Sequence, residues 1–139
     1  MAQNTVVTWT DDMAFDVELD GHHFMIDADE KFGGKNRGPR PKALLLSGLA
    51  GCTGMDVVSL LGKMKMSFDK FALEIEGELA EEHPEAYTDI VIRYIFHGKE
   101  LDKDKIEKSV KLSLDKYCGV HTMLAKSANV RHEIVLNPG

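Results

Sequence analysis

The sequence lacks any dense run of basic residues, and its 23 acidic residues outnumber the 17 lysines and arginines, giving a net charge of −6. A protein that binds nucleic acid needs a basic face to neutralise phosphates, so this class of partner is excluded. The sequence also contains no phosphate-binding loop, dinucleotide fingerprint or serine elbow. Its first residues lack the charged start, apolar run and cleavage site of a secretory signal, so we expect a cytoplasmic protein.

Histidine spacings typical of metal sites are also missing. Among the six histidines, His22 and His23 are adjacent and would point to opposite faces of a strand, and no pair has the i, i+4 spacing of ligands on a helix. We therefore expect no metal site.

Several segments alternate between apolar and polar residues, as half-buried strands do. Residues 13–19 alternate in this way and are followed by Asp20-Gly21, a strong hairpin signal, so residues 5–9, 13–19 and 22–27 predict an antiparallel meander. Residues 31–40 predict an exposed loop, and Pro41 is placed to open a long helix that runs to residue 61. The alternation returns in residues 71–79, where Glu74, Glu76 and Glu78 predict a solvated face, and in residues 88–97.

Helical spacing replaces this alternation from Asp102, with Ile106, Val110, Leu114 and Tyr117 on one stripe. A shorter helical run follows Gly119, and residues 130–136 predict a last strand. The order of three strands, a helix, two strands, a helix pair and a strand predicts an α+β fold, and the length of 139 residues fits a single domain, 1–139.

The run from Ala43 to Leu61 is nearly apolar for about the length that crosses a bilayer. Asp56, four Gly and Ser positions and the polar remainder of the chain favour a helix buried in a soluble protein instead. A helix that is apolar nearly all round needs cover on every side, which a second copy of the chain would supply. The glycines of this helix permit a close crossing of helices between two copies, or they only admit bulky strand side chains within one copy.

The two cysteines are Cys52, within this apolar helix, and Cys118, near the start of the short helix. In a reducing compartment a pair can be free thiols, catalytic groups or buried small residues, so their number alone decides nothing. The start of a helix favours a thiolate at Cys118, and His121, three residues on, is a candidate base or proton donor to it. Asp56 lies one turn beyond Cys52, where we expect it to make a buried hydrogen bond or to tie two helices together.

Two segments carry a resemblance to a known family. RPKALLLSGLAGCTGMDVVSLL at residues 40–61 and KYCGVHTMLAK at residues 116–126 are similar to the OsmC/Ohr superfamily of hydroperoxide-detoxifying proteins, especially its YhfA-like branch. The resemblance implies an OsmC-like fold, in which antiparallel sheets wrap around long central apolar helices in an intertwined homodimer. It also implies that the two cysteines meet near the subunit interface.

The resemblance further implies a cysteine-based thiol peroxidase that reduces organic hydroperoxides. Cys52 matches the peroxidatic cysteine, which becomes a sulfenic acid, and Cys118 matches the resolving cysteine, which converts it to a disulfide. A small dithiol or lipoyl-type reductant would restore the thiols, and no cofactor is implied. Leu45, Leu49, Met55 and Val58 are available to line an apolar substrate pocket.

The sequence departs from the family pattern at the expected ion pair. Residues 1–30 contain no arginine to stabilise the thiolate, and Lys42 and Ala43 follow Pro41 where a glutamate is usual. Arg37, Arg40 and Lys42 are the alternative activating cations, although the two arginines are more typical of solvated loop charges. This departure keeps a second function open, namely a non-catalytic dimer that binds a small molecule or senses redox state.

Overall fold

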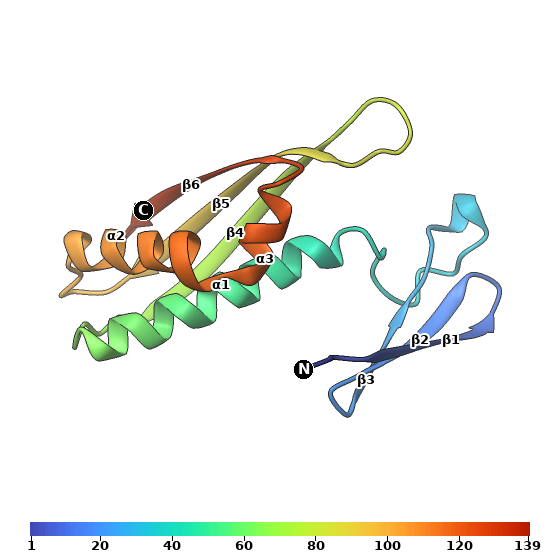
Figure 1. The fold of residues 1–139 in the computed structure, drawn as a ribbon, viewed down its shortest axis with the longest axis horizontal. Helices are drawn as coiled ribbons and strands as arrows, with labels where there is room; N and C mark the ends of the chain where they lie inside the picture. Colours follow the sequence, from blue (N-terminus) through green and yellow to red (C-terminus); the bar gives the residue numbers. More distant parts are fainter. The chain divides into compact units, whose positions relative to one another are not determined.

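The computed structural model describes residues 1–139, which form two compact units, Met1–Leu45 and Leu46–Gly139 (Figure 1). The first unit is a three-stranded antiparallel sheet of β1 (Thr5–Asp11), β2 (Ala14–Leu19) and β3 (His22–Ile26), in that order. Asp20 and Gly21 join β2 to β3 with φ angles of 51° and 78°. Two successive positive φ angles are what a two-residue hairpin of this kind requires, so the predicted meander is confirmed.

The loop after β3 is fastened by a buried carboxylate. Asp27, 2% exposed, accepts hydrogen bonds from the backbone N–H groups of Ala28, Lys35 and Arg37 and from Nε of Arg37. A short 3₁₀ turn, η1 (Glu30–Phe32), lies within this loop. A Cβ on Gly34 would collide with the Ala28 carbonyl oxygen, so glycine is required for this close approach. The expected exposed loop is therefore held by hydrogen bonds.

The second unit contains the sheet order β4-β5-β6, with strands β4 (Lys70–Leu79), β5 (Tyr87–His97) and β6 (Asn129–Leu136). β4 and β5 are antiparallel, but β6 runs parallel to β5, so the expectation of purely antiparallel sheets is wrong for this unit. The reason is the connection: a parallel neighbour needs a crossover, and the helical segment between β5 and β6 provides it.

The predicted alternation of apolar and polar residues is present in β4. Phe71, Leu73 and Ile75 are half-buried, and the three glutamates Glu74, Glu76 and Glu78 are exposed, as predicted. Leu79, expected on the apolar face, is 43% exposed because the strand register shifts between Glu78 and Leu79. A residue at such an irregularity no longer follows the two-residue period of the strand.

One long helix, α1 (Leu44–Lys63), and the crossover segment pack on the same face of this sheet (Figure 1). The crossover consists of α2 (Lys103–Leu112), the π-helical turn η2 (Ser113–Tyr117) and α3 (Gly119–Leu124). The core joins apolar residues of α1, α2 and β5, all completely buried: Leu49, Val57, Leu61, Ile106, Val110, Ile90, Ile92, Tyr94 and Phe96.

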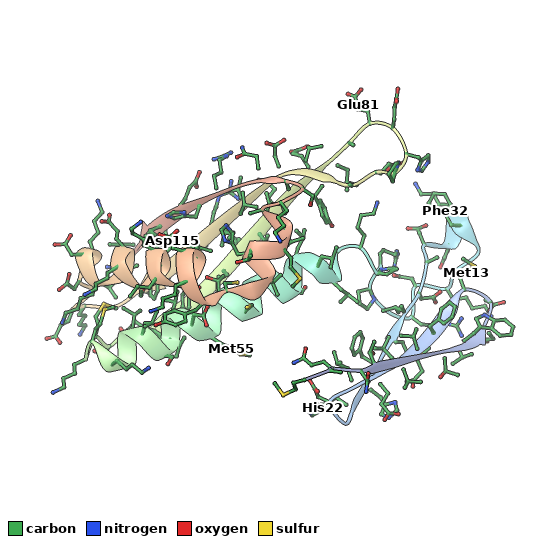
Figure 2. All side chains as sticks on the ribbon, viewed as in Figure 1. Met13, His22, Phe32, Met55, Glu81 and Asp115 are labelled. Carbon is green, nitrogen blue, oxygen red and sulfur yellow. The ribbon has the colours of Figure 1, made fainter.

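α1 begins three residues later than the expected start at Pro41. Pro41 and Lys42 accept the backbone hydrogen bonds of Leu44 and Leu45 and form a turn, so Lys42 precedes the helix. By length and composition alone α1 is apolar enough to cross a membrane, and one side of it belongs to the core. Much of its remaining surface is exposed, with Met55, labelled in Figure 2, at 76% and Val58 at 48%.

The predicted stripe of the helix pair is interrupted at η2. Ile106 and Val110 are buried as expected, but Tyr117 is 51% exposed. The backbone N–H of Cys118 donates to the carbonyl of Ser113 at 2.7 Å, an i to i+5 bond. A π turn holds more residues than an α turn, so residues beyond it rotate away from the stripe.

The first unit should lose stability in acid through Asp27. Burial alone would raise the pKa of this carboxyl, but the three backbone donors and the Arg37 guanidinium outweigh it and hold the pKa at about 2, below the ordinary 3.8. Since the folded-state pKa is depressed, the stabilisation is complete above the ordinary value and is lost as pH falls through about 2. The protection of the loop 27–37 against amide hydrogen exchange, relative to the intrinsic rate at each pH, should fall across this window.

The Asp27→Asn variant should show faster exchange in this loop already at neutral pH, because the charge that accepts these bonds is gone. The matched control is Asp20→Asn in the β2–β3 turn, where asparagine tolerates the positive φ. Equal protection of the loop in wild type and Asp27→Asn would contradict the anchoring role of Asp27.

Candidate functional site

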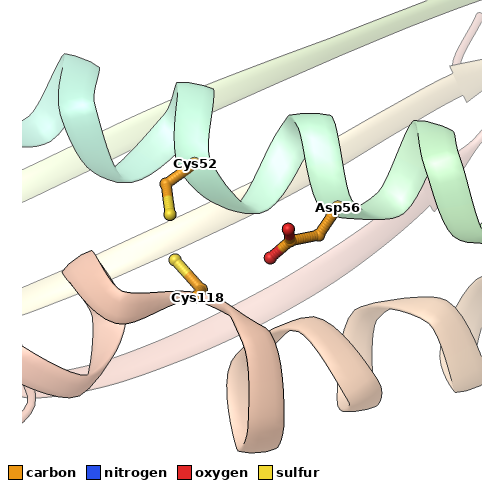
Figure 3. Close-up of side chains that lie close together, drawn as sticks. All are labelled: Cys52, Asp56 and Cys118. Atoms are coloured by element: carbon orange, nitrogen blue, oxygen red, sulfur yellow. The ribbon is translucent and has the colours of Figure 1, made fainter.

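The two cysteines lie on elements that face one another across the second unit. Cys52 is half-buried in the middle of α1, and Cys118 is 1% exposed at the junction of η2 and α3. Their side chains point toward each other, and the carboxylate of Asp56 turns toward the same space (Figure 3). The two sulfurs and a carboxylate oxygen of Asp56 all lie within 4.8 Å of one another. Both cysteines are free thiols, so the arrangement is that of a reduced pair.

Asp56 ends a chain of buried hydroxyl groups. Ser113 Oγ donates to Asp56 Oδ2 at 2.8 Å, Thr53 Oγ1 lies 2.7 Å from Ser113 Oγ, and Tyr94 Oη lies 2.8 Å from Thr53 Oγ1. Because the proton of Ser113 is used on the carboxylate, the chain is oriented with Tyr94 donating to Thr53 and Thr53 donating to Ser113. Asp56 thus ties α1 to η2.

The surroundings of Cys118 keep its proton in place. Burial raises the pKa of this thiol most, while the backbone N–H of His121, at 3.4 Å from Sγ, lowers it. The neighbouring Cys52 sulfur and the Asp56 carboxylate raise it further, and the pKa reaches about 11. The expectation that the start of a helix makes Cys118 a ready thiolate is therefore wrong. One N–H group of a six-residue helix lowers the thiol pKa by less than burial, the Cys52 sulfur and the Asp56 carboxylate together raise it.

The ring of His121 is held by another group. Its Nδ1 lies 3.0 Å from the carbonyl oxygen of Leu114, which can only accept, so Nδ1 carries the proton. The contact of His121 with the Cys118 sulfur is made by its backbone. A role of the ring in proton transfer to the thiol stays a prediction that would have to involve Nε2.

The candidate activating cations belong to the first unit. Arg37 pairs with Asp11 at 2.6 Å and with Asp27 at 3.1 Å, and Arg40 donates to Asn36 and to the carbonyl of Gly38. Lys42 lies in the turn before α1. The side chains of both arginines are therefore engaged within their own unit, and activation of Cys52 by any of the three cations stays a prediction.

The residues expected to line an apolar pocket separate into two groups. Met55 and Val58 line a groove of about 520 Å³ between α1 and β4, together with Gly51, Gly54 and Leu73. Leu49 is completely buried in the core, so it does not line this groove, and Leu45 is half-exposed at the start of α1. Successive residues of a helix are about 100° apart, so this groove lies on a different side of α1 from Cys52.

A smaller pocket, of about 230 Å³, opens next to this groove and shares Met55 and Ser59 with it. Asp56, Lys63 and Tyr117 also line this smaller pocket.

No local pattern of residues predicted the hydroxyl chain. Thr53 and Ser113 are 60 positions apart in the sequence, and Tyr94 lies in β5. The available signal was weak: single polar residues at buried positions of otherwise apolar patterns, which usually need a hydrogen-bond partner.

Comparisons with known proteins bear on the family and the fold of the chain. A profile of the family described as OsmC-like protein matches residues 33–133. The chain belongs to the OsmC-like family. It is 31% identical over 127 residues to the protein YhfA of Escherichia coli K12, covering 91% of this chain and 92% of YhfA.

Solved OsmC-like structures share this fold. A hypothetical protein from Aquifex aeolicus VF5 superposes with a TM-score of 0.82 at 26% identity, with 99% of both chains covered. An organic hydroperoxide resistance protein OsmC from Legionella pneumophila superposes with a TM-score of 0.72 at 13% identity, with 97% of both chains covered. The α+β OsmC-like fold predicted from the sequence is therefore confirmed.

The two thiols should differ sharply in reactivity toward an alkylating agent. At neutral pH Cys118 should stay unmodified by iodoacetamide, since its raised pKa keeps it protonated and its side chain is buried. Its alkylation should rise only as pH approaches about 11. Peptide mapping by mass spectrometry at several pH values measures both sites.

The Cys52→Ser variant should lower the pKa of Cys118, because one of the groups that raise it is removed. In denaturant both cysteines of the wild type should react alike. Rapid alkylation of Cys118 in the folded protein at neutral pH would contradict the arrangement.

Proposed function

We propose that this protein is a thiol peroxidase that reduces organic hydroperoxides with Cys52 as the attacking thiol and Cys118 as the resolving thiol. The observation that carries the proposal is the placement of two free thiols and one carboxylate within 4.8 Å of one another on two facing elements. Membership of the OsmC-like family supports it, since structural neighbours include proteins named for organic hydroperoxide resistance.

The exposure and the protonation of the two thiols assign the attacking role to Cys52 and the resolving role to Cys118. Cys52 is half-buried and Cys118 is almost completely buried, so a peroxide reaches Cys52 first. The Cys52 thiolate attacks the O–O bond, and the leaving alkoxide takes up a proton, which gives a sulfenic acid and an alcohol. The Cys118 sulfur then attacks the sulfenic sulfur. A disulfide forms, and the Cys118 proton and the sulfenic hydroxyl leave as water.

The proton on Cys118 keeps this thiol out of the first step, the reaction with peroxide. A resolving thiol must not compete for the peroxide, and a pKa of about 11 keeps its sulfur protonated until the sulfenic acid forms beside it. A small dithiol or lipoyl-type compound would then reduce the disulfide, and no metal or organic cofactor takes part. A reducing, cytoplasmic location is the natural setting for this cycle.

We also infer that the chain works as a homodimer, in one OsmC-like domain per chain. Met55 and Val58 leave an apolar side of α1 exposed, and a Cβ on Gly48 or Gly51 would meet nothing within 4 Å. An apolar helix side with room for close approach is suited to cover by a second copy.

An observation also favours a second function, a redox-sensing or small-molecule-binding dimer without turnover. The charged group beside both sulfurs within the second unit is Asp56, an anion, and an anion disfavours a thiolate. Under this alternative the thiols would oxidise slowly and would not be cycled by a dithiol.

The decisive experiment follows the thiols and the peroxide together. Reduced wild type given one equivalent of an organic hydroperoxide should lose two thiols for each peroxide consumed, and a dithiol should restore both and sustain turnover. Thiol titration and hydroperoxide consumption measure these quantities. Wild-type thiols that persist through repeated additions of peroxide would contradict the enzymatic function and leave the binding function.

Substitutions separate the two thiols. Cys52→Ser should abolish turnover, at least a hundredfold below wild type, because the attacking sulfur is gone. Cys118→Ser should consume one peroxide and stop at a sulfenic acid, which dimedone traps and mass spectrometry detects. Turnover by Cys52→Ser at the wild-type rate would exclude Cys52 as the attacking thiol.

The dimer is tested by substituting an exposed methionine. Sedimentation of wild type should give the mass of two chains, and Met55→Glu should shift the equilibrium toward one chain by at least tenfold, because it places a charge in the apolar contact. The control is Met123→Glu, since Met123 is a comparably exposed methionine on α3. A wild type that sediments as one chain at all concentrations would contradict the dimer.

A further inference from the structure

The sulfur pair and its carboxylate have the composition of a metal site as well as that of a redox site. We propose that Cys52, Cys118 and Asp56 together bind a thiophilic divalent cation, Zn²⁺, in the reduced protein. This activity goes beyond the proposed peroxidase and does not depend on it. It also revises the expectation of no metal site, which considered only histidine spacing.

The spacing of the three ligand atoms fits a zinc ion. Zn–S bonds of about 2.3 Å and Zn–O bonds of about 2.1 Å, in tetrahedral geometry, place neighbouring ligand atoms roughly 3.5 to 3.8 Å apart. The two sulfurs and the carboxylate oxygen already lie within 4.8 Å of one another, and their side chains converge on one point (Figure 3). The three atoms therefore lie close to the spacing that a tetrahedral zinc ion requires.

The carboxylate ligand is positioned by the hydroxyl chain. Ser113 donates to Asp56 Oδ2, and Thr53 and Tyr94 continue the chain into the core. Hydrogen bonds of this kind orient a ligating carboxylate and are a regular part of metal sites in proteins. The other lone pairs of the carboxylate remain for the metal.

The chemistry of the donor set points the same way. Two thiols and one carboxylate offer two sulfur ligands and one oxygen ligand, which are ligand types that Zn²⁺ binds. The bound cation takes the place of both thiol protons. The balanced reaction is two thiols and one Zn²⁺ giving one zinc dithiolate and two protons.

The site also has a pocket beside it and an open coordination position. An open pocket of about 230 Å³ lies beside the cluster and is lined in part by Asp56. Three protein ligands leave the fourth position of a tetrahedral zinc ion for water or a small ligand. A disulfide has no thiolate to offer, so oxidation of Cys52 and Cys118 must release the metal, and bound metal must protect the pair from peroxide.

The test uses the full chain, reduced and free of metal, with no peroxide present. Competition against a chromophoric chelator should show one Zn²⁺ bound per chain, and Co²⁺ as a spectroscopic substitute should give thiolate-to-cobalt charge-transfer bands. The same protein oxidised to the disulfide should bind neither ion. Reduced wild type that binds no Zn²⁺, or disulfide protein that binds it equally, would overturn the proposal.

The aspartate is tested by Asp56→Asn, which keeps both thiols and the size of the side chain. Its Zn²⁺ affinity should fall at least tenfold, because a charged ligand is replaced by a weak neutral one. The control is Asp69→Asn, the same change at an exposed position before β4. An affinity of Asp56→Asn equal to that of wild type would overturn the three-ligand site.

Circular dichroism shows whether Asp56→Asn is folded. If Asp56→Asn is unfolded, Cys118→Ser is tested instead. The cobalt charge-transfer bands should then be lost, and bands that persist at full intensity would overturn the proposal. Since hydroperoxide turnover is measured on metal-free protein, a failure of metal binding leaves the peroxidase assay unaffected, and the reverse is also true.

Discussion

An acidic side chain on an apolar helix has to be given hydrogen-bond donors, and the site of this protein depends on how Asp56 receives them. The chain of hydroxyls from Tyr94 through Thr53 and Ser113 ends on its carboxylate and joins β5, α1 and η2. A polar group without a hydrogen-bond partner at a buried position would destabilise the fold by about 1 to 3 kcal/mol. The same contacts fix the distance between α1 and η2, and that distance brings the sulfurs of Cys52 and Cys118 together.

The second constraint is topological. β6 lies parallel to β5, so the chain between them has to cross one face of the sheet, and α1 already occupies that face. Cys118 lies at the break of this crossover, where the π turn η2 gives way to α3. The break has a local role: it turns Ser113 toward Asp56, and it leaves Cys118 as the first residue before a new helix. The meeting of residues 52 and 118 is thus a consequence of the crossover.

The sequence predicted those features that a local pattern determines. The period of β4, the Asp20-Gly21 turn and the order of elements follow from alternation, turn chemistry and helical spacing, each read over a few residues. The direction of β6, the exposure of Tyr117 and the hydroxyl chain depend on contacts between distant segments. The pKa of Cys118 was predicted in the wrong direction for the same reason. The helix start is visible in sequence, whereas the burial and the neighbours that outweigh it are not.

Asp56 shows why one cluster can serve two chemistries. For a peroxidase the carboxylate is a handicap, since it opposes ionisation of the thiols, and the family's usual remedy is an arginine that residues 1–30 do not supply. For a cation the same carboxylate is an advantage, because it adds a charged ligand to two sulfurs. Under the two proposals, a bound cation would take the place of the thiol protons and keep the sulfurs from reacting with peroxide, so peroxide reduction and metal binding would exclude one another. The carboxylate of Asp56 therefore opposes one of the two proposed chemistries and supports the other.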